Sequence, residues 1–162
     1  LVTRNSLINE PVATLSDRDP KRTDILHEYF VAPQKFPDFV LACQKIIPNS
    51  YQEFLNITLR YVSQDDESYL SYATTPRIAA VMSFSQEKTK RAEADMANMT
   101  RMLIDAIIEL GGSYYLPYRQ HPTIRQFEKV YPKAQRFALE KRQLDPDLLF
   151  RNNFWDTYLD KI

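Results

Sequence analysis

Hydrophobic and polar positions change their spacing along the chain, and these changes predict an α+β domain. Alternating or short apolar segments, typical of strands, occupy residues 27–33, 55–62, 69–73, 77–85 and 113–118. Helical spacing covers residues 36–47 and 90–110, followed by two helices that separate at Pro132 and a short aromatic helix near the C-terminus. Residues 1–24 show neither spacing, so we expect an arm or linker there and a domain over residues 25–162.

The resulting element order predicts a ferredoxin-like antiparallel sheet with one extra strand and with its helices on one face. Alternation in residues 55–62 directs Leu55, Ile57 and Leu59 toward the helices. The open face of the sheet is then expected to carry Thr58, Arg60, Ser83, Tyr114 and Tyr118. A face with these residues is either exposed to solvent or covered by another domain or molecule.

Composition narrows the class of protein. The chain has 162 residues, 44% of them hydrophobic, which suits one globular domain. Lys+Arg and Asp+Glu both number 21, so there is no basic excess to favour nucleic acid or an anionic membrane. The lone Cys43 allows no internal disulfide and fits a reducing compartment such as the cytoplasm. No apolar run approaches the roughly 20 residues of a transmembrane segment.

The chain holds only two glycines, Gly111 and Gly112. They follow the second helical segment, where a glycine supplies the left-handed cap that ends a helix. None remains for a loop that cradles a phosphate, so this chain is not expected to hold a nucleotide pyrophosphate by itself. It also begins at Leu1 without methionine, and we expect it to be part of a longer protein.

The chemically capable residues leave alternatives open. His27 and His121 lie on unrelated segments without metal-ligand spacing, so we expect structural histidines and no metal site. Cys43 is on an apolar helical stripe and is expected to be buried and inert. Arg60, in the middle of a strand, indicates either a structural salt bridge or a group that stabilises an anion. The tyrosines after Gly112 indicate either packing or a binding surface.

Four segments resemble one family: “HEYFVAP”, “LRYVSQDDESYLS”, “GGSYYLPYR” and “YPKAQRFALEKRQLDPDLLFRNNF”. Their order is similar to that in the C-terminal part of FAD-dependent oxidoreductases of the vanillyl-alcohol-oxidase type, nearest the aldonolactone and alditol oxidases. The resemblance implies a cap or substrate domain whose open sheet face covers the flavin. FAD would be bound mainly by the protein's own N-terminal domain, upstream of Leu1. The whole enzyme would oxidise a C–H(OH) group of a polyol, sugar or lactone, and this fragment alone would be inactive.

The resemblance also implies roles for individual residues. Arg60 matches an arginine near the flavin, where a cation would stabilise the charge that develops during hydride transfer. Tyr118 falls where related enzymes carry a lysine and is the second catalytic candidate, although a tyrosine brings no cation at neutral pH. The remaining candidates are Thr58, Ser83, Tyr115 and Arg119 for substrate, and Asn152 and Asn153, with Arg60, for the cofactor. The alternative is a stand-alone ferredoxin-like binding or regulatory module.

Overall fold

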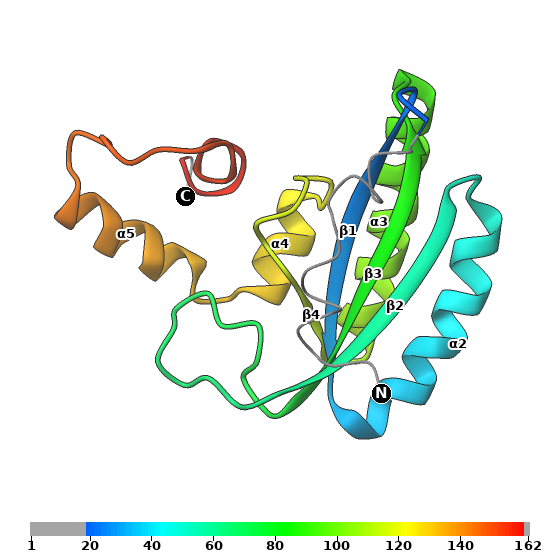
Figure 1. Cartoon of the computed structure of the whole chain (residues 1–162). Helices are drawn as coiled ribbons and strands as arrows, with labels where there is room; N and C mark the ends of the chain where they lie inside the picture. Colours follow the sequence, from blue (N-terminus) through cyan, green and yellow to red (C-terminus); the bar gives the residue numbers. More distant parts are fainter. Residues whose placement is uncertain (1–18, 161–162) are drawn as a thin grey trace, which may run out of the picture.

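The computed structural model describes residues 19–160, which form an α+β fold around one four-stranded antiparallel sheet (Figure 1). The strands are β1 (Arg22–Val31), β2 (Glu53–Val62), β3 (Arg77–Glu87) and β4 (Ser113–Tyr114). The helices are α2 (Phe36–Ile46), α3 (Lys90–Glu109), α4 (Ile124–Val130) and α5 (Ala134–Leu144), with short helical turns at Pro33–Lys35, Ile47–Asn49 and Trp155–Leu159. The two predicted helices on either side of Pro132 are thereby confirmed.

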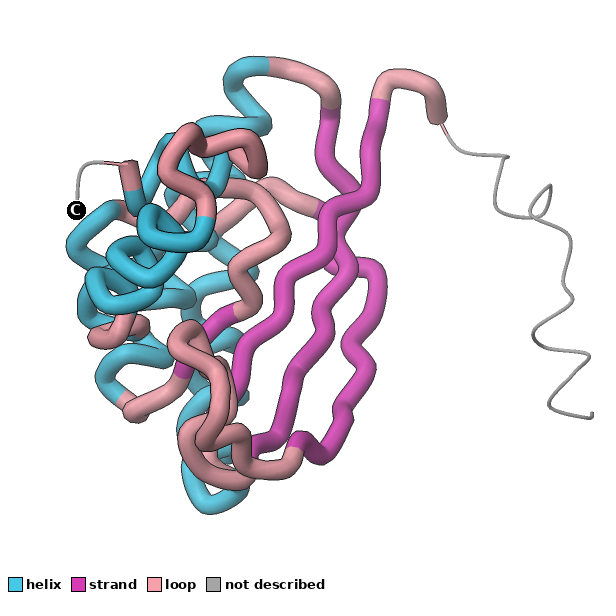
Figure 2. The backbone as a smooth tube through the Cα atoms, turned by 90° about the vertical axis from the view of Figure 1, so that its left-hand side faces the viewer, coloured by secondary structure: helices cyan, strands magenta, loops and turns pink. Residues whose placement is uncertain are grey.

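The sheet has the order β2-β3-β1-β4, so β2 and β3 are neighbours, whereas the connections from β1 to β2 and from β3 to β4 each pass over one strand. Each of the three strand pairings is antiparallel. Figure 2 shows the helices gathered on one side of the strands, which leaves the other side without a helical layer. We call this second side the open face.

The core lies between the sheet and α3. Met96, Met99, Leu103 and Ile107 form a buried stripe along this helix, as its spacing predicted. These methionines fill space in the core. From α2, Cys43 joins the same core, and burial raises the pKa of its thiol to about 12. The prediction of a buried, inert cysteine is confirmed, because the thiolate is the reactive form.

The first strand begins earlier than predicted. β1 starts at Arg22, so residues 22–24 belong to the sheet and not to an arm. Arg22 pairs with Glu87 in the ladder, and its Nε donates to Ser85 Oγ at 2.8 Å. These partners lie more than sixty positions away, which is why local spacing missed them. Residues 1–18 of the predicted arm lie outside the described residues.

The predicted strand at residues 69–73 is wrong: the segment belongs to the long loop between β2 and β3. Its aromatic residue Tyr72 stacks on Phe30 of β1, with ring centroids 4.4 Å apart. The Tyr72 carbonyl accepts a hydrogen bond from Ser113 Oγ at 2.5 Å. The apolar residues of this loop therefore cover one end of the open face with side chains instead of pairing their backbone.

The prediction that helices cover the apolar side of residues 55–62 is also wrong. Ile57 and Leu59 pair with Met82 and Ala80, whose side chains are buried on the helix side, yet their own side chains are 41% and 51% exposed. β2 is an edge strand, and the helical layer covers its neighbours instead. A register shift between Phe54 and Asn56 takes Leu55 out of the alternation altogether, because a bulge adds one unpaired residue.

The glycine pair ends α3 as predicted. Gly111 has a φ of 66°, the left-handed conformation, and its N–H donates to the Ile108 carbonyl at 3.1 Å. The Gly112 N–H donates to the Ile107 carbonyl at 2.7 Å, which completes a Schellman cap. A Cβ on Gly112 would lie 2.6 Å from the Phe30 carbonyl oxygen. The second glycine is therefore required by the close approach of α3's end to β1.

We expect Gly112→Ala to lower the free energy of unfolding by about 2–3 kcal/mol, because the methyl group would push against backbone atoms. Gly111→Ala is the matched control. It meets no atom within 4 Å, so only the left-handed backbone opposes it, at a cost of about 1 kcal/mol. Urea denaturation of the two variants measures the difference, and equal losses would contradict the close approach.

Candidate functional site

Three of the candidate residues share the open face. Cross-strand partners in a sheet point to the same side, and the ladder joins Thr58 with Val81, Arg60 with Ala79, and Asn56 with Ser83. Thr58, Arg60 and Ser83 are thus on the face away from the helices. Local alternation predicted this correctly.

Arg60 forms an ion pair on that face. Its NH2 lies 2.5 Å from Glu28 Oε1 of β1, and the Glu28 side chain is 7% exposed. Arg60 itself is 57% exposed, so the rest of the guanidinium remains at the surface. The observed pair favours the structural alternative for Arg60, since a carboxylate buried to this degree needs a cation.

The tyrosines after Gly112 divide between the two sides of the sheet. Tyr114 pairs with Tyr29 and packs edge-on against Tyr131 in the core. The prediction that Tyr114 lies on the open face is therefore wrong. Alternation sends the next tyrosine the other way: Tyr115 contacts both Tyr72 and Tyr118, with ring centroids 5.7 and 5.2 Å apart. Packing explains the first tyrosine, while the other two face a hollow.

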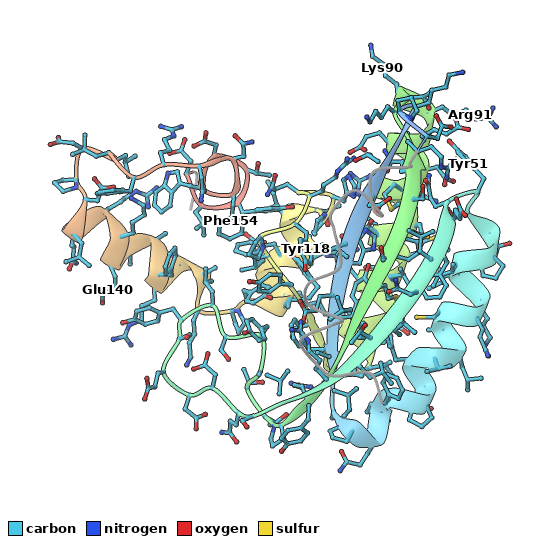
Figure 3. The ribbon with its side chains drawn as sticks, viewed as in Figure 1. Tyr51, Lys90, Arg91, Tyr118, Glu140 and Phe154 are labelled. Atoms are coloured by element: carbon cyan, nitrogen blue, oxygen red, sulfur yellow. The ribbon has the colours of Figure 1, made fainter. Side chains whose placement is uncertain are left out.

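This hollow, which we call the tyrosine hollow, has a volume of about 920 Å³. Its lining comes from β1, the loop before β3, the segment after β4 and the C-terminal segment: Asp24, Ile25, Leu26, Leu70, Tyr72, Tyr115, Leu116, Pro117, Tyr118, Arg119, Gln120, Asn152, Asn153 and Phe154. Figure 3 labels Tyr118 and Phe154, which line the hollow from two of these segments. Five candidate residues thereby meet, whereas Thr58, Arg60 and Ser83 lie outside the lining.

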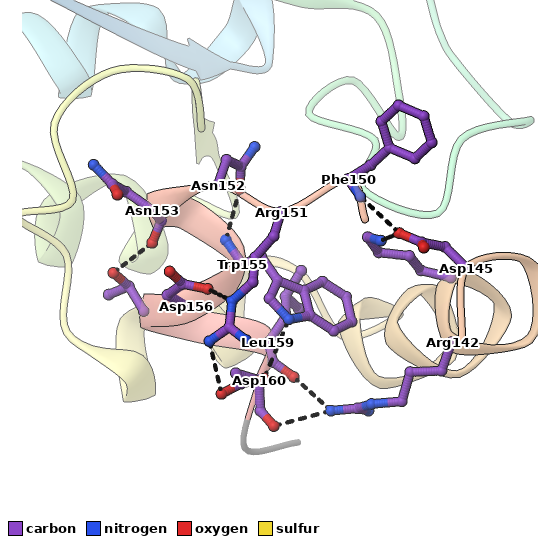
Figure 4. A network of polar contacts seen from close by, with 12 residues as sticks. Arg142, Asp145, Phe150, Arg151, Asn152, Asn153, Trp155, Asp156, Leu159 and Asp160 are labelled. Carbon is purple, nitrogen blue, oxygen red and sulfur yellow. Dashed lines mark hydrogen bonds and ion pairs between the residues drawn. The ribbon is translucent and has the colours of Figure 1, made fainter. Parts of the chain in front are cut away.

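A polar network holds the C-terminal side of the hollow (Figure 4). Arg151 forms ion pairs with Asp156 and Asp160, while Asn152 Oδ1 accepts a hydrogen bond from the Trp155 N–H at 2.9 Å. The Asn153 carbonyl accepts from Thr157 Oγ1 at 2.7 Å. Asn152 therefore caps the last helical turn, and its amide nitrogen and the second lone pair of Oδ1 remain available to a ligand.

The geometry suits a small polar ligand. The volume is within the range of small-molecule sites, and the lining combines apolar walls with three phenol groups, one guanidinium, three side-chain amides and one carboxylate. Burial and, next, the charge of Glu28 raise the pKa of Tyr118, so its phenol is a hydrogen-bond donor at neutral pH. No glycine lies in the lining to bring backbone close to a pyrophosphate. The hollow can contact a ring or hydroxyl groups of a cofactor better than its phosphates.

A buried polar network on the helix side escaped the sequence analysis. His27 and His121, expected on unrelated segments, both approach Thr100 Oγ1, at 3.4 and 3.3 Å. The Thr100 hydroxyl donates to the Met96 carbonyl at 2.7 Å, so its lone pairs face the two rings. Tyr29 OH lies 3.0 Å from His27 Nδ1. The only signal in the sequence was a threonine on the buried side of α3.

Both histidines are buried and hydrogen-bonded, in agreement with a structural role. Within residues 19–160 there is no group of three potential ligands that could hold a metal ion. Burial lowers the pKa of His27 to about 3, and the charges of His121 and Arg119 act in the same direction. The folded protein thus contains this imidazole in its neutral form.

Comparison with known proteins identifies no relative: no family model and no curated protein matches the chain. Among the described residues, no helix is both long and apolar enough to span a membrane.

The buried His27 makes stability depend on pH. Its pKa is about 3 when folded and 6.5 when exposed, so the unfolded chain binds one more proton as the pH falls between these values. His27 therefore lowers the free energy of unfolding by up to about 1.4 kcal/mol per pH unit below pH 6.5, with no penalty above it. Urea denaturation at pH 7, 6, 5 and 4 should show a shallower slope for His27→Gln than for the wild type.

Thr100→Val is the control for this measurement. It removes hydrogen bonds from the same network and retains the His27 imidazole, so stability falls while the pH slope persists. An unchanged slope in His27→Gln would show that another group carries the pH dependence.

Proposed function

We propose that this chain is the cap or substrate domain of a FAD-dependent oxidoreductase that oxidises a C–H(OH) group of a polyol, sugar or lactone. The observation that carries the proposal is the tyrosine hollow, which brings together Tyr115, Tyr118, Arg119, Asn152 and Asn153 from two distant segments. All five are candidates from the family resemblance. Chance proximity is a poor explanation, because the tyrosines and the asparagines lie more than thirty positions apart.

The fold agrees with this proposal. The order β-α-β-β-α-β, the strand arrangement β2-β3-β1-β4 and the helices on one face support the proposed ferredoxin-like sandwich. In the proposed enzyme the open face and the adjoining tyrosine hollow roof the isoalloxazine ring. The scarcity of glycine fits a chain that leaves the FAD phosphates to another domain.

The chain's own groups would bind and orient the substrate. Tyr118 and Arg119 donate hydrogen bonds to hydroxyl oxygens, and the aromatic walls exclude water from the reacting carbon. The flavin supplies the hydride acceptor. Arg60 is paired with Glu28 and is 57% exposed, and its remaining N–H donors would lie on the same face, where they would stabilise the negative charge that the flavin gains on accepting the hydride.

The direct test is the absorption spectrum of the full-length protein. A flavin spectrum that bleaches anaerobically with a polyol or an aldonolactone supports the proposal. The 162-residue chain purified alone is expected to be colourless and without oxidase activity, because it lacks a phosphate-binding loop. A full-length protein without flavin would overturn the proposal and favour a stand-alone binding module.

The role of Arg60 can be separated from its ion pair. In the full-length enzyme, Arg60→Met should slow anaerobic flavin reduction in stopped flow by about 10²–10³-fold, since a preorganised charge is lost from the transition state. Glu28→Gln is the matched control, because it breaks the same ion pair and leaves the cation in place. It should lower the melting temperature as Arg60→Met does, with a much smaller effect on reduction. Equal rates in the two variants would restrict Arg60 to a structural role.

A further inference from the structure

The carboxylate of Glu93 contacts three side chains beside the tyrosine hollow. Glu93, in the first turn of α3, accepts hydrogen bonds from Gln86 Nε2 at 2.8 Å and from His121 Nε2 at 2.7 Å. It also forms an ion pair with Arg119. Although burial acts to raise the pKa of Glu93, the hydrogen bonds from Gln86 and His121 and the charge of Arg119 hold it below its usual value. Glu93 is therefore ionised at neutral pH.

Two of these partners belong to the segment that lines the hollow. Arg119 is part of the lining, and the backbone N–H of His121 donates to the backbone carbonyl of Arg119 at 2.9 Å. The backbone carbonyl of His121 is also bound, since it accepts a hydrogen bond from Arg101 Nε at 2.8 Å. Glu93 thus holds the segment both directly, through the guanidinium, and indirectly, through the buried imidazole.

We propose that Glu93 is a positioning residue that orients Arg119 at the tyrosine hollow and offsets its charge, so that the site selects uncharged polyhydroxy ligands over anionic ones. The guanidinium has five N–H donors, and Glu93 occupies only part of them, which leaves others for hydroxyl oxygens. Its positive charge, however, is paired at contact distance. An anionic ligand would gain less from Arg119 than from an unpaired arginine. The ligand class rests on the proposed function, whereas the positioning of the segment does not.

The positioning can be tested in the 162-residue chain by amide hydrogen exchange. Glu93→Gln should accelerate exchange in residues 116–121 about tenfold, above all at His121, whose backbone N–H is hydrogen-bonded to the Arg119 carbonyl, because the charge-assisted contacts that hold the segment are lost. Asp95→Asn is the matched control. Asp95 lies on the same helix and accepts hydrogen bonds from Ser50 and Gln52 at 2.7 and 2.8 Å, away from the hollow. It should leave exchange at residues 116–121 unchanged.

The selectivity is tested in the full-length flavin enzyme with sorbitol as a neutral probe and gluconate as an anionic one. The apparent dissociation constant of each is measured, from the concentration dependence of flavin reduction if it is a substrate or from competition if it is not, and the ratio of the two constants is compared between variants. Glu93→Gln should shift the ratio toward gluconate by about two- to fivefold, since it leaves the partly exposed Arg119 charge unpaired. A purely structural role would weaken both probes equally. Asp95→Asn should not change the ratio.

Arg119→Gln keeps the proposal testable if Glu93→Gln folds poorly, since it removes the guanidinium without altering α3. It leaves the Glu93 charge unpaired beside the hollow, so the ratio should shift toward sorbitol, and an unchanged ratio would contradict the role of the pair. Unchanged exchange at residues 116–121 in Glu93→Gln would overturn the positioning role. An unchanged ratio in an enzyme that does reduce its flavin would overturn the selectivity. Absence of flavin reduction in the wild type would refute the proposed function and the ligand class with it, and the exchange result would still decide the positioning.

Discussion

The short pairing between β4 and β1 is the constraint on which the rest of the site depends. Only Ser113 and Tyr114 join the ladder, and the Tyr115 N–H adds one more bond to the Glu28 carbonyl, at 2.9 Å. Pro117 follows and has no N–H to donate, so the chain leaves β1. The separation between the departing segment and β1 becomes the tyrosine hollow. A longer β4 would close the sheet edge over the same space.

The segment that leaves the sheet needs other support, and polar contacts on the helix side provide it. Glu93 and Arg101 of α3 hold it through Arg119 and His121, and Tyr158 OH of the C-terminal segment donates to the Pro122 carbonyl at 2.8 Å. His121 is buried, so its polar groups cost free energy unless they are paired, and these contacts thereby restrict the segment. The same contacts join the hollow to the core of the domain.

Local patterns were sufficient wherever near neighbours decide the structure. The buried stripe of α3 and the Gly111 cap followed from helical spacing and from the conformational freedom of glycine. The common face of Thr58, Arg60 and Ser83 followed from strand alternation, because successive side chains of a strand point to opposite sides whatever lies beyond them. The resemblance named the ligand candidates, although it did not reveal which of them meet.

Only the tertiary structure decided which side chains become neighbours. The alternation of residues 55–62 is the same for an edge strand and a central one, so the exposure of Ile57 and Leu59 depended on the strand order β2-β3-β1-β4. The meeting of His27 with His121, and that of Tyr118 with Asn153, likewise requires segments far apart in the chain to pack together. The sequence by itself determined the helices, the glycine cap and the orientation of side chains within each strand, since these depend on contacts a few residues apart. The hollow and its charges required the folded chain, because long-range pairing and burial created them.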